Sequence, residues 1–347
     1  TYMDLVVNDG TTTQRFPMTI DQTATSTLKN GIFQDKEQYI YKDIAQKGRY
    51  LYHFEASDGI TTLRFPSVGE LTFETGYSNV VFFHGTAGSR LYEYDPAVID
   101  VCATNSTPTD HYFKRWLPYI DCDNSRLYLN SDGSSKQNIF TKDTLEEAGG
   151  ILNIYLSFVN DLESWKNIEQ IINDYSVIPY DWRLSINDIL TKGKKNSLGY
   201  IDYNDLLSQA ETPYVISELE RMVESSANGK VVLVGHSNGG LIVKELTRRL
   251  EIEGKGDLID KLILVATPQV GTPEAVATLL HGSDIGFSGI ISDKKQTRLL
   301  SNNMPTAYNL LPSLEYFTTD MAAYIPIAMF DNSDLYSNET SSYGVSV

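Results

Sequence analysis

One stretch of the chain, Lys230–Leu250, constrains the fold more than any other. Its first part, Val231–Val234, is a run of four apolar residues, which is typical of a strand buried on both faces. Its last part, Leu241–Leu250, carries apolar residues at helical spacing. Between them lies G-H-S-N-G-G, at Gly235–Gly240. The stretch therefore predicts a strand, a sharp turn and a helix, with Ser237 at the turn.

A serine flanked by glycines at such a turn is the nucleophile elbow pattern, G-x-S-x-G. The turn forces the serine into strained backbone geometry, and only residues without Cβ allow the helix and strand to approach each other so closely. The hydroxyl of Ser237 would then project above the sheet edge, at the positive end of a helix. The alternative is a glycine-rich turn in which Ser237 has only a structural role. The flanking strand and helix favour the nucleophile.

The charge and composition exclude several classes of function. The 347 residues carry a net charge of −17, which argues against nucleic acid as the partner and against electrostatic docking on anionic membranes. Apolar docking on a lipid surface stays possible. No window of this sequence is long and apolar enough for a transmembrane helix, and none has the pattern of the apolar core of a signal peptide. No cluster of His and Cys suggests a metal, and we expect no cofactor. Because the chain starts at Thr1 rather than Met, we expect it to be part of a longer protein.

The first part of the chain contains an internal repeat. Residues 8–17, N-D-G-T-T-T-Q-R-F-P, match residues 57–66, S-D-G-I-T-T-L-R-F-P. Apolar residues alternate with polar ones before each Asp-Gly pair, which predicts two β-hairpins. The segment is similar to immunoglobulin-like repeats of bacterial surface proteins. We therefore expect residues 1–20 to end one β-sandwich and residues 21–77 to form a small immunoglobulin-like domain. A β-subdomain that belongs to the following domain is the alternative.

From residue 78 on, buried strands alternate with helices. Val80–Phe83 and Lys261–Val265 read as strands on either side of the Ser237 turn in the chain, and Asp161–Tyr175 and Pro213–Ser226 read as helices. The pattern predicts an α/β domain with a largely parallel sheet. Two long insertions, 95–149 and 271–316, appear irregular in sequence, and insertions of this length usually serve function.

Acyl transfer by a serine needs a base, an acid that orients the base, and donors for the oxyanion. In this architecture one donor is the amide of the residue after the nucleophile, here Asn238. The second comes from the loop after an earlier strand, where Thr86 follows His84 and Gly85. Neither His84 nor His236 is expected to act as the base, since the base follows the nucleophile in chain order. His281 follows Ser237 too soon in the chain to qualify.

The second domain resembles the lecithin:cholesterol acyltransferase family of α/β-hydrolases, which includes phospholipases and bacterial extracellular lipases. The resemblance covers about residues 78–317 and rests on five segments. These are V-V-F-F-H-G-T-A-G-S-R-L-Y-E-Y (80–94), P-Y-D-W-R-L (179–184), the elbow (235–239), L-I-L-V-A-T-P-Q-V-G-T-P (262–273) and M-P-T-A-Y-N-L-L-P-S (304–313). It implies an α/β-hydrolase fold with lid insertions over residues 78–347, and a chemistry of lipid esters.

The resemblance also implies a disulfide between Cys102 and Cys122 that closes a lid loop, and an extracellular or cell-surface location. Reduced thiols in the core are the alternative for the two cysteines. In the family the triad acid and histidine lie well beyond the equivalent of Ser313, and no histidine follows the acidic candidates Asp320, Asp331 and Asp334. We therefore expect the acid and the base beyond residue 347, with the catalytic domain incomplete at its C-terminus.

Asp181 and Arg183, in the P-Y-D-W-R-L segment, are expected to form a structural ion pair rather than to act as acid or base. The sequence thus predicts a serine hydrolase or acyltransferase that acts on lipid acyl esters through an acyl-Ser237 intermediate, without a metal. The competing hypothesis is a surface adhesion protein with a catalytically inactive hydrolase fold. The sequence leaves the lipid class, the acyl acceptor and the oligomeric state open.

Overall fold

We analysed a computed structural model of the chain. It describes residues 2–21, 38–42, 48–96, 102, 110–117, 121–148, 152–204, 207, 211–282 and 294–318. The chain divides into two compact units. The first comprises Thr1–Ser78 and Ser225–Lys230, and the second comprises Asn79–Glu224 and Val231–Val347.

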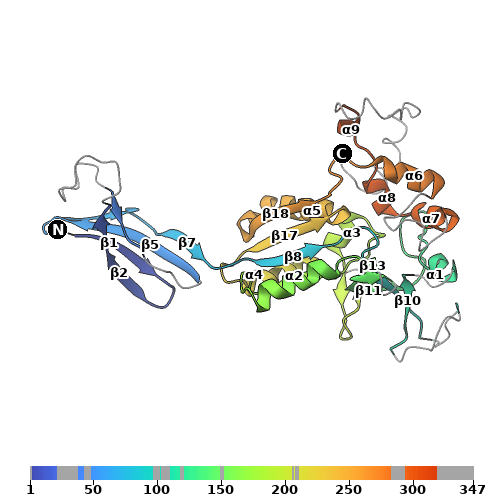
Figure 1. Cartoon of the computed structure of the whole chain (residues 1–347), viewed down its shortest axis with the longest axis horizontal. Coiled ribbons are helices and arrows are strands. Elements are labelled where there is room, and N and C mark those ends of the chain that lie inside the picture. Colours follow the sequence, from blue (N-terminus) through green and yellow to red (C-terminus); the bar gives the residue numbers. More distant parts are fainter. Residues whose placement is uncertain are drawn as a thin grey trace. The chain divides into compact units, whose positions relative to one another are not determined.

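The first unit is built on one five-stranded antiparallel sheet (Figure 1). Its strands are β1 (Tyr2–Asn8), β2 (Thr13–Pro17), β5 (Gly48–Ser57), β6 (Thr62–Phe65) and β7 (Leu71–Thr75). The strand order is β2-β1-β5-β6, and β7 also pairs with β5. A separate two-stranded ribbon joins β3 (Thr19–Ile20) to β4 (Tyr39–Ile40).

The two sequence repeats form two hairpins that share this sheet. At each turn an aspartate accepts hydrogen bonds from two backbone amides, those of Thr11 and Thr12 at Asp9 and those of Ile60 and Thr61 at Asp58. The predicted hairpins are therefore present. The strands β1 and β5 pair with each other around Leu5 and Phe54, which occupy equivalent positions in the two repeats. The four strands thus have an approximate two-fold symmetry about that pair.

This pairing differs from the expected boundary at residue 20. Strands β1 and β2, predicted to end a preceding repeat, hydrogen-bond into the same sheet as the strands of residues 48–75. The reason is that equivalent strands of the two repeats satisfy each other's backbone groups, which a single hairpin leaves open on one edge. The described strands leave the immunoglobulin-like sandwich a prediction.

The second unit contains a parallel sheet of four strands in the order β14-β8-β17-β18. They are β8 (Asn79–Phe83), β14 (Tyr175–Ile178), β17 (Val231–His236) and β18 (Ile259–Val265). The expected α/β architecture with a parallel sheet is present in this unit. The helices that follow these strands are α2 (Leu156–Asn167), α3 (Ile186–Thr191), α4 (Tyr214–Glu224) and α5 (Asn238–Ile252).

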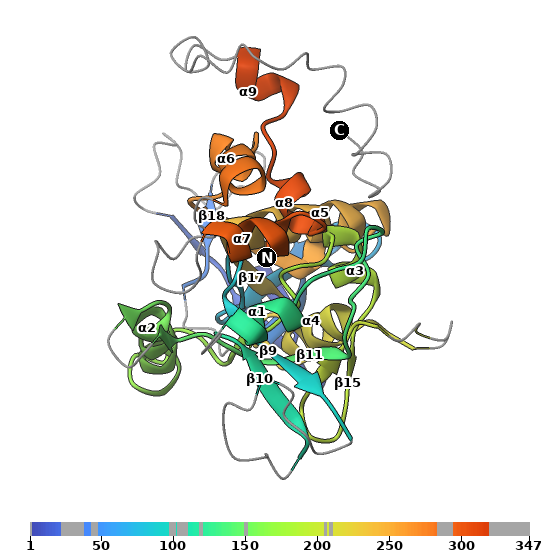
Figure 2. The same cartoon turned by 90° about the vertical axis from the view of Figure 1, so that its right-hand side faces the viewer.

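Helices cover both faces of this sheet (Figure 2). Successive residues of a strand point to opposite faces, so Phe82 and Val234 pack with Leu162 of α2. Val81 and Leu233, on the opposite face, join a larger core with α4 and α5. This two-sided burial explains the continuous apolar runs in the sequence.

The first long insertion, expected to be irregular, carries regular structure. Its elements are β10 (Tyr112–Trp116), α1 (Asp121–Arg126), β11 (Ile139–Thr144) and β12 (Glu147–Ala148). Strands β10 and β11 both pair with β9 (Ser89–Tyr94), and β16 (Ile201–Asp202) and β15 (Lys194–Lys195) extend the sheet. The pairing strands lie far apart in sequence, so local pattern does not reveal them. Strand β12 pairs with β13 (Leu152–Asn153).

Two helix predictions compare differently with the structure. The helix predicted over Asp161–Tyr175 is wrong in its bounds, because α2 ends at Asn167 and Tyr175 already begins β14. The helix predicted over Pro213–Ser226 matches α4 closely.

The remaining described elements lie around and after β18. A short 3₁₀ helix (Gly256–Leu258) precedes β18. The helices that follow β18 are α6 (Pro273–His281), α7 (Lys294–Ser301), α8 (Pro305–Asn309) and α9 (Leu314–Thr318).

Candidate active site

Ser237 lies at the junction of β17 and α5, with φ +52° and ψ −124°. This is a rare conformation for a residue with a side chain and is typical of functional turns. The neighbouring glycines permit it. A Cβ on Gly239 would stand 2.3 Å from the carbonyl oxygen of Phe83, and one on Gly235 would stand 2.5 Å from Cα of Gly240. The G-x-S-x-G pattern is therefore required by backbone packing around the serine.

Ser237 lines a cavity of about 650 Å³ in the second unit. Most of the lining is apolar and comes from strands β8, β17 and β18 and from helices α2, α6 and α8. The residues of the wall are Phe82, Gly85, Thr86, Ile154, Tyr155, Phe158, Val234, His236, Ser237, Val265, Ala266, Pro268, Thr272, Glu274, Ala275, Thr278, Met304, Ala307 and Leu310. A cavity of this size and polarity suits a hydrophobic ligand.

The two residues expected to hold the oxyanion, Thr86 and Asn238, come from different segments of the chain. Thr86 lines the same cavity, on the loop that follows β8. Asn238 is fully buried and is the first residue of α5. Within the part of the chain that the structure describes, the backbone amides of Thr86 and Asn238 donate no hydrogen bond. Both are free to receive an oxyanion, and their role stays a prediction.

None of the five histidines of the chain hydrogen-bonds the hydroxyl of Ser237, and all five lie among the described residues. His281 is the last residue of α6. The acidic candidates Asp320, Asp331 and Asp334 lie outside the described residues. Among the described residues the structure therefore assigns neither a triad acid nor a triad base.

His84 has the structural role that its position predicts. Its Nδ1 contacts the carbonyl oxygen of Gly85 at 2.7 Å, its Nε2 contacts the hydroxyl of Ser89, and its ring stacks on Tyr180 at 4.1 Å. Complete burial lowers the pKa of His84 to about 3, so the ring is neutral. A neutral imidazole with both nitrogens engaged shapes the loop and does not accept a proton from Ser237.

His236 belongs to a cluster that sequence reasoning missed. Tyr155 places its hydroxyl 2.9 Å from Nδ1 of His236 and accepts a hydrogen bond of 2.8 Å from the amide of Gly85. Burial also lowers the pKa of His236. No local pattern marks Tyr155, because its partners come from two distant segments of the chain. The cluster belongs to the cavity wall and joins the loop after β8 to the last residue of β17.

Asp181 and Arg183 form the expected ion pair. Arg183 donates to both carboxylate oxygens of Asp181, at 2.9 and 2.5 Å, and both side chains are buried. The guanidinium also donates to the carbonyl of Leu127 at 2.8 Å. The pair thus ties the loop after β14 to the insertion that follows β9, and neither residue lines the cavity.

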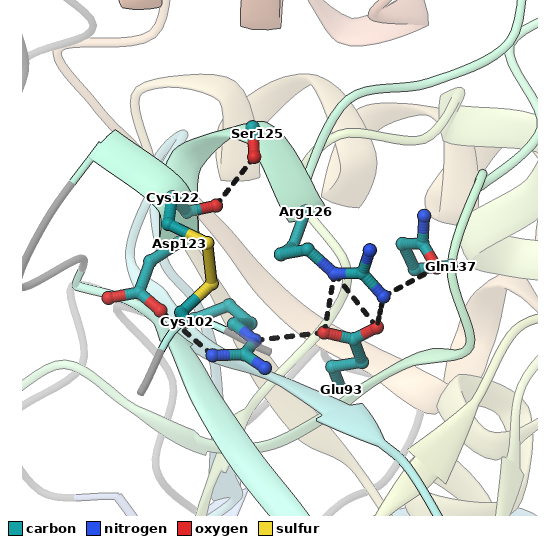
Figure 3. The surroundings of a disulfide bond; sticks show 8 residues. Glu93, Cys102, Cys122, Asp123, Ser125, Arg126 and Gln137 are labelled. Atoms are coloured by element: carbon teal, nitrogen blue, oxygen red, sulfur yellow. Dashed lines mark hydrogen bonds and ion pairs between the residues drawn. A yellow bond between two sulfur atoms is a disulfide. The ribbon is translucent and has the colours of Figure 1, made fainter. Parts of the chain in front are cut away.

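The structure contains a disulfide between Cys102 and Cys122, as the family resemblance implied, with the Cα atoms 5.6 Å apart. A buried ion network lies beside it (Figure 3). Arg115 donates to Glu93 and to Asp123, each at 2.9 Å, and Arg126 donates to Glu93 and to Gln137. The network fixes α1 onto strands β9 and β10, and the disulfide ties α1 to Cys102. A lid role for the segment between the cysteines stays a prediction.

Among the described residues, no group of three or more His, Cys, Asp or Glu is arranged to hold a metal ion. No described helix is long and apolar enough to cross a membrane.

The strained serine at the carboxyl edge of a parallel sheet, with helices on both faces and an apolar cavity in front, defines the class as α/β proteins of the hydrolase type. The family model for lecithin:cholesterol acyltransferase matches residues 140–345, more than half of the chain. The chain therefore belongs to the lecithin:cholesterol acyltransferase family, which places it among acyltransferases and lipase-like hydrolases of lipid esters. A search of curated proteins found no match.

Proposed function

We propose that this protein is a serine esterase or O-acyltransferase that cleaves or transfers the acyl group of a lipid ester through an acyl-Ser237 intermediate. The observation that carries the proposal is the conformation of Ser237, strained at φ +52° and open to a cavity of about 650 Å³. Strain of this kind persists only where surrounding structure imposes it, and it is concentrated at functional sites.

The chemistry follows from the arrangement around the serine. The oxygen of Ser237 bonds to the ester carbonyl carbon while its proton passes to a base, and the carbonyl oxygen becomes an oxyanion. The amides of Thr86 and Asn238 donate to that oxyanion, each worth roughly 3 kcal/mol in the transition state. The carbon–oxygen bond to the alcohol then breaks, and the leaving oxygen takes the proton. Water or an acceptor alcohol releases the acyl group by the same steps.

The apolar wall of the cavity supports an acyl chain as the group that is transferred. Phe82, Phe158 and Leu310 all line it, and burying such surface is favourable by about 25 cal/mol per Å². The base is assigned to none of the five histidines, since none contacts the hydroxyl of Ser237 in the structure.

The test is ester hydrolysis by the natural protein, with p-nitrophenyl butyrate and with an emulsified long-chain glyceride. Ser237→Ala should abolish hydrolysis of both, while Ser217→Ala, on the exposed side of α4, should leave both rates unchanged. Equal rates in the wild type and in Ser237→Ala would contradict the proposal.

A second function is favoured by the same missing contact between Ser237 and a histidine. A surface adhesion protein that retains the hydrolase fold without its chemistry would show this arrangement. Its natural form would hydrolyse neither ester, and Ser237→Ala would then change nothing. The two functions are therefore separated by the rate of the wild type alone.

We also propose that the protein acts outside the cell or on its surface. The Cys102–Cys122 bond supports this location, because disulfides persist in oxidising compartments. Thiol titration of the unreduced, unfolded natural protein should find neither cysteine reactive. Two reactive thiols would remove the support.

A further inference from the structure

Tyr155 connects the two segments that meet at Ser237. The residue stands immediately before α2, and its side chain reaches across the carboxyl ends of β8 and β17. There its hydroxyl accepts the amide hydrogen of Gly85 at 2.8 Å and lies 2.9 Å from Nδ1 of His236. Gly85 directly precedes Thr86, and His236 directly precedes Ser237. One phenol thus joins the proposed oxyanion loop to the proposed nucleophile.

The direction of each hydrogen bond in this cluster is determined by its chemistry. The amide of Gly85 can only donate, so the phenol oxygen accepts there. The phenol proton is then available for Nδ1 of His236, which accepts only in the neutral ring. Burial keeps this ring neutral by lowering the pKa of His236, and burial raises the pKa of Tyr155 so that the phenol keeps its proton. The Gly85 amide thus donates to the Tyr155 hydroxyl, and the Tyr155 hydroxyl donates to Nδ1 of His236.

Gly85 packs closely against the residues around Ser237. A Cβ at Gly85 would stand 3.0 Å from Cβ of Ser237, 3.1 Å from Nδ1 of His236 and 3.4 Å from the hydroxyl of Tyr155. The ring of Tyr155 is itself held edge-on by Phe82, with ring centroids 5.3 Å apart. The loop backbone therefore lies close against the serine. The phenol binds the Gly85 amide there, while Nδ1 of His84 binds the Gly85 carbonyl.

We propose that Tyr155 is a positioning residue, which holds the Gly85–Thr86 loop so that the amide of Thr86 meets the oxyanion, and that His236 orients the Tyr155 hydroxyl. The inference rests on the proposed serine chemistry. The oxyanion forms in the transition state and the tetrahedral intermediate and is absent from the bound ester, so loss of positioning lowers kcat and leaves substrate binding nearly unchanged. A displacement of about 1 Å at such a site costs on the order of 100-fold in rate.

The first experiment measures kcat and KM of the natural protein on p-nitrophenyl butyrate. Tyr155→Phe keeps the ring and removes the hydroxyl, and kcat should fall about 10- to 100-fold with KM within about twofold. The matched control is Tyr175→Phe, whose hydroxyl bonds Glu163 at 2.7 Å on α2, and its kinetics should stay at the wild-type values. A wild-type kcat in Tyr155→Phe, with Ser237→Ala inactive, overturns the role of Tyr155 and leaves the proposed function intact.

Variants of His236 separate orientation of the hydroxyl from a general loss of packing. His236→Asn keeps an acceptor near the place of Nδ1 and should retain most of the activity. His236→Leu removes the acceptor and should fall to the level of Tyr155→Phe. Because the two residues act as one unit, the double variant should be no worse than either single variant. If the losses in kcat of the two single variants multiplied in the double variant, the proposal that His236 acts through the Tyr155 hydroxyl would be overturned.

A second measurement does not depend on activity. Hydrogen exchange of the Gly85 amide should be faster in Tyr155→Phe than in the wild type and unchanged in Tyr175→Phe. Unchanged exchange at Gly85 in Tyr155→Phe contradicts the inference even if the wild type hydrolyses no ester. If the wild type were inactive but exchange at Gly85 were faster in Tyr155→Phe, the proposed serine chemistry would be wrong and the contact that holds the loop would still be supported.

Discussion

The amide of Ser237 donates a hydrogen bond of 2.9 Å to the carbonyl of Val265, the last residue of the neighbouring strand β18. The strained serine is thus fixed to the sheet on one side and begins α5 on the other. In the described part of the parallel sheet, β18 is a terminal strand, and Leu262, Ile263 and Val265 are 38–45% exposed on it. The elbow is held by a strand that itself is only partly covered.

The close packing behind the elbow predicts a large effect of a single methyl group. Gly239→Ala would place Cβ 2.3 Å from the carbonyl oxygen of Phe83, and backbone cannot yield as a side chain does. We expect a loss of about 2 kcal/mol or more in the free energy of unfolding, measured by urea titration. The control is Gly256→Ala, whose new Cβ would meet the flexible Glu251 side chain at 3.1 Å. Equal stability of the two variants would contradict the packing argument.

The buried ion network beside the disulfide gives a second prediction. Glu93 is buried and accepts hydrogen bonds from Arg115 and Arg126. Glu93→Gln removes one of the two described carboxylates that pair with buried Arg115 and leaves Asp123. The change should cost about 3 kcal/mol in the free energy of unfolding. In Glu253→Gln, where the carboxylate pairs with Lys255 at the surface, the change should stay within about 0.5 kcal/mol. Thermal or urea unfolding measures both, and similar small losses would mean that the network is not a stabilising unit.

A third prediction concerns the hydroxyl of Thr86. Its Oγ1 is buried at the cavity wall and has no hydrogen-bond partner among the described residues. If it assists the amide in holding the oxyanion, Thr86→Val should lower kcat by about 10- to 100-fold, short of the 100- to 1,000-fold loss of a full oxyanion donor. Thr86→Ser keeps the hydroxyl and should retain most of the rate. Equal kcat in the Val and Ser variants would show that the hydroxyl has no part in catalysis.

The buried His84 predicts a dependence of stability on pH. Its pKa is about 3 in the folded chain and about 6.5 when exposed, so below pH 6.5 the unfolded state binds a proton that the folded state does not. The stability is therefore fully present above pH 6.5 and falls on acidification, by up to about 1.4 kcal/mol per pH unit.

The measurement is urea unfolding at pH 7 and pH 5 for the wild type and for His84→Gln. The variant lacks the titrating ring and should lose less stability than the wild type between these two values, by up to about 2 kcal/mol. The comparison uses the change with pH, so a lower starting stability of the variant does not affect it. Identical losses in both proteins would show that His84 does not stay neutral in the fold.

Sequence patterns predicted those parts of the molecule whose causes are local. The Ser237 turn, the apolar runs of β8 and β17 and the two Asp-Gly hairpins all follow from neighbouring residues. The sheet around β9 was not predicted from the sequence, because its strands lie far apart in the chain, as β11 and β16 do. The shared sheet of the two repeats was missed for the same reason.

In the candidate site, too, residues marked by a local pattern were predicted and residues brought together by the fold were not. Ser237, Thr86 and Asn238 were predicted from strand–turn–helix patterns, since each stands within three residues of the carboxyl end of a strand. Tyr155 carried no such signal, because its importance comes from contacts with Gly85 and His236, which the fold brings together. A cavity wall made from several segments is a tertiary property.

We propose that the hydroxyl of Ser237 is a nucleophile for acyl groups. The decisive measurement is to treat the natural protein with a fluorophosphonate and to map the modified peptide by mass spectrometry. We predict one modified residue, Ser237, with no modification in Ser237→Ala and undiminished modification in Ser217→Ala. Modification of another residue to the same extent in wild type and Ser237→Ala, or none in the wild type, would contradict the claim.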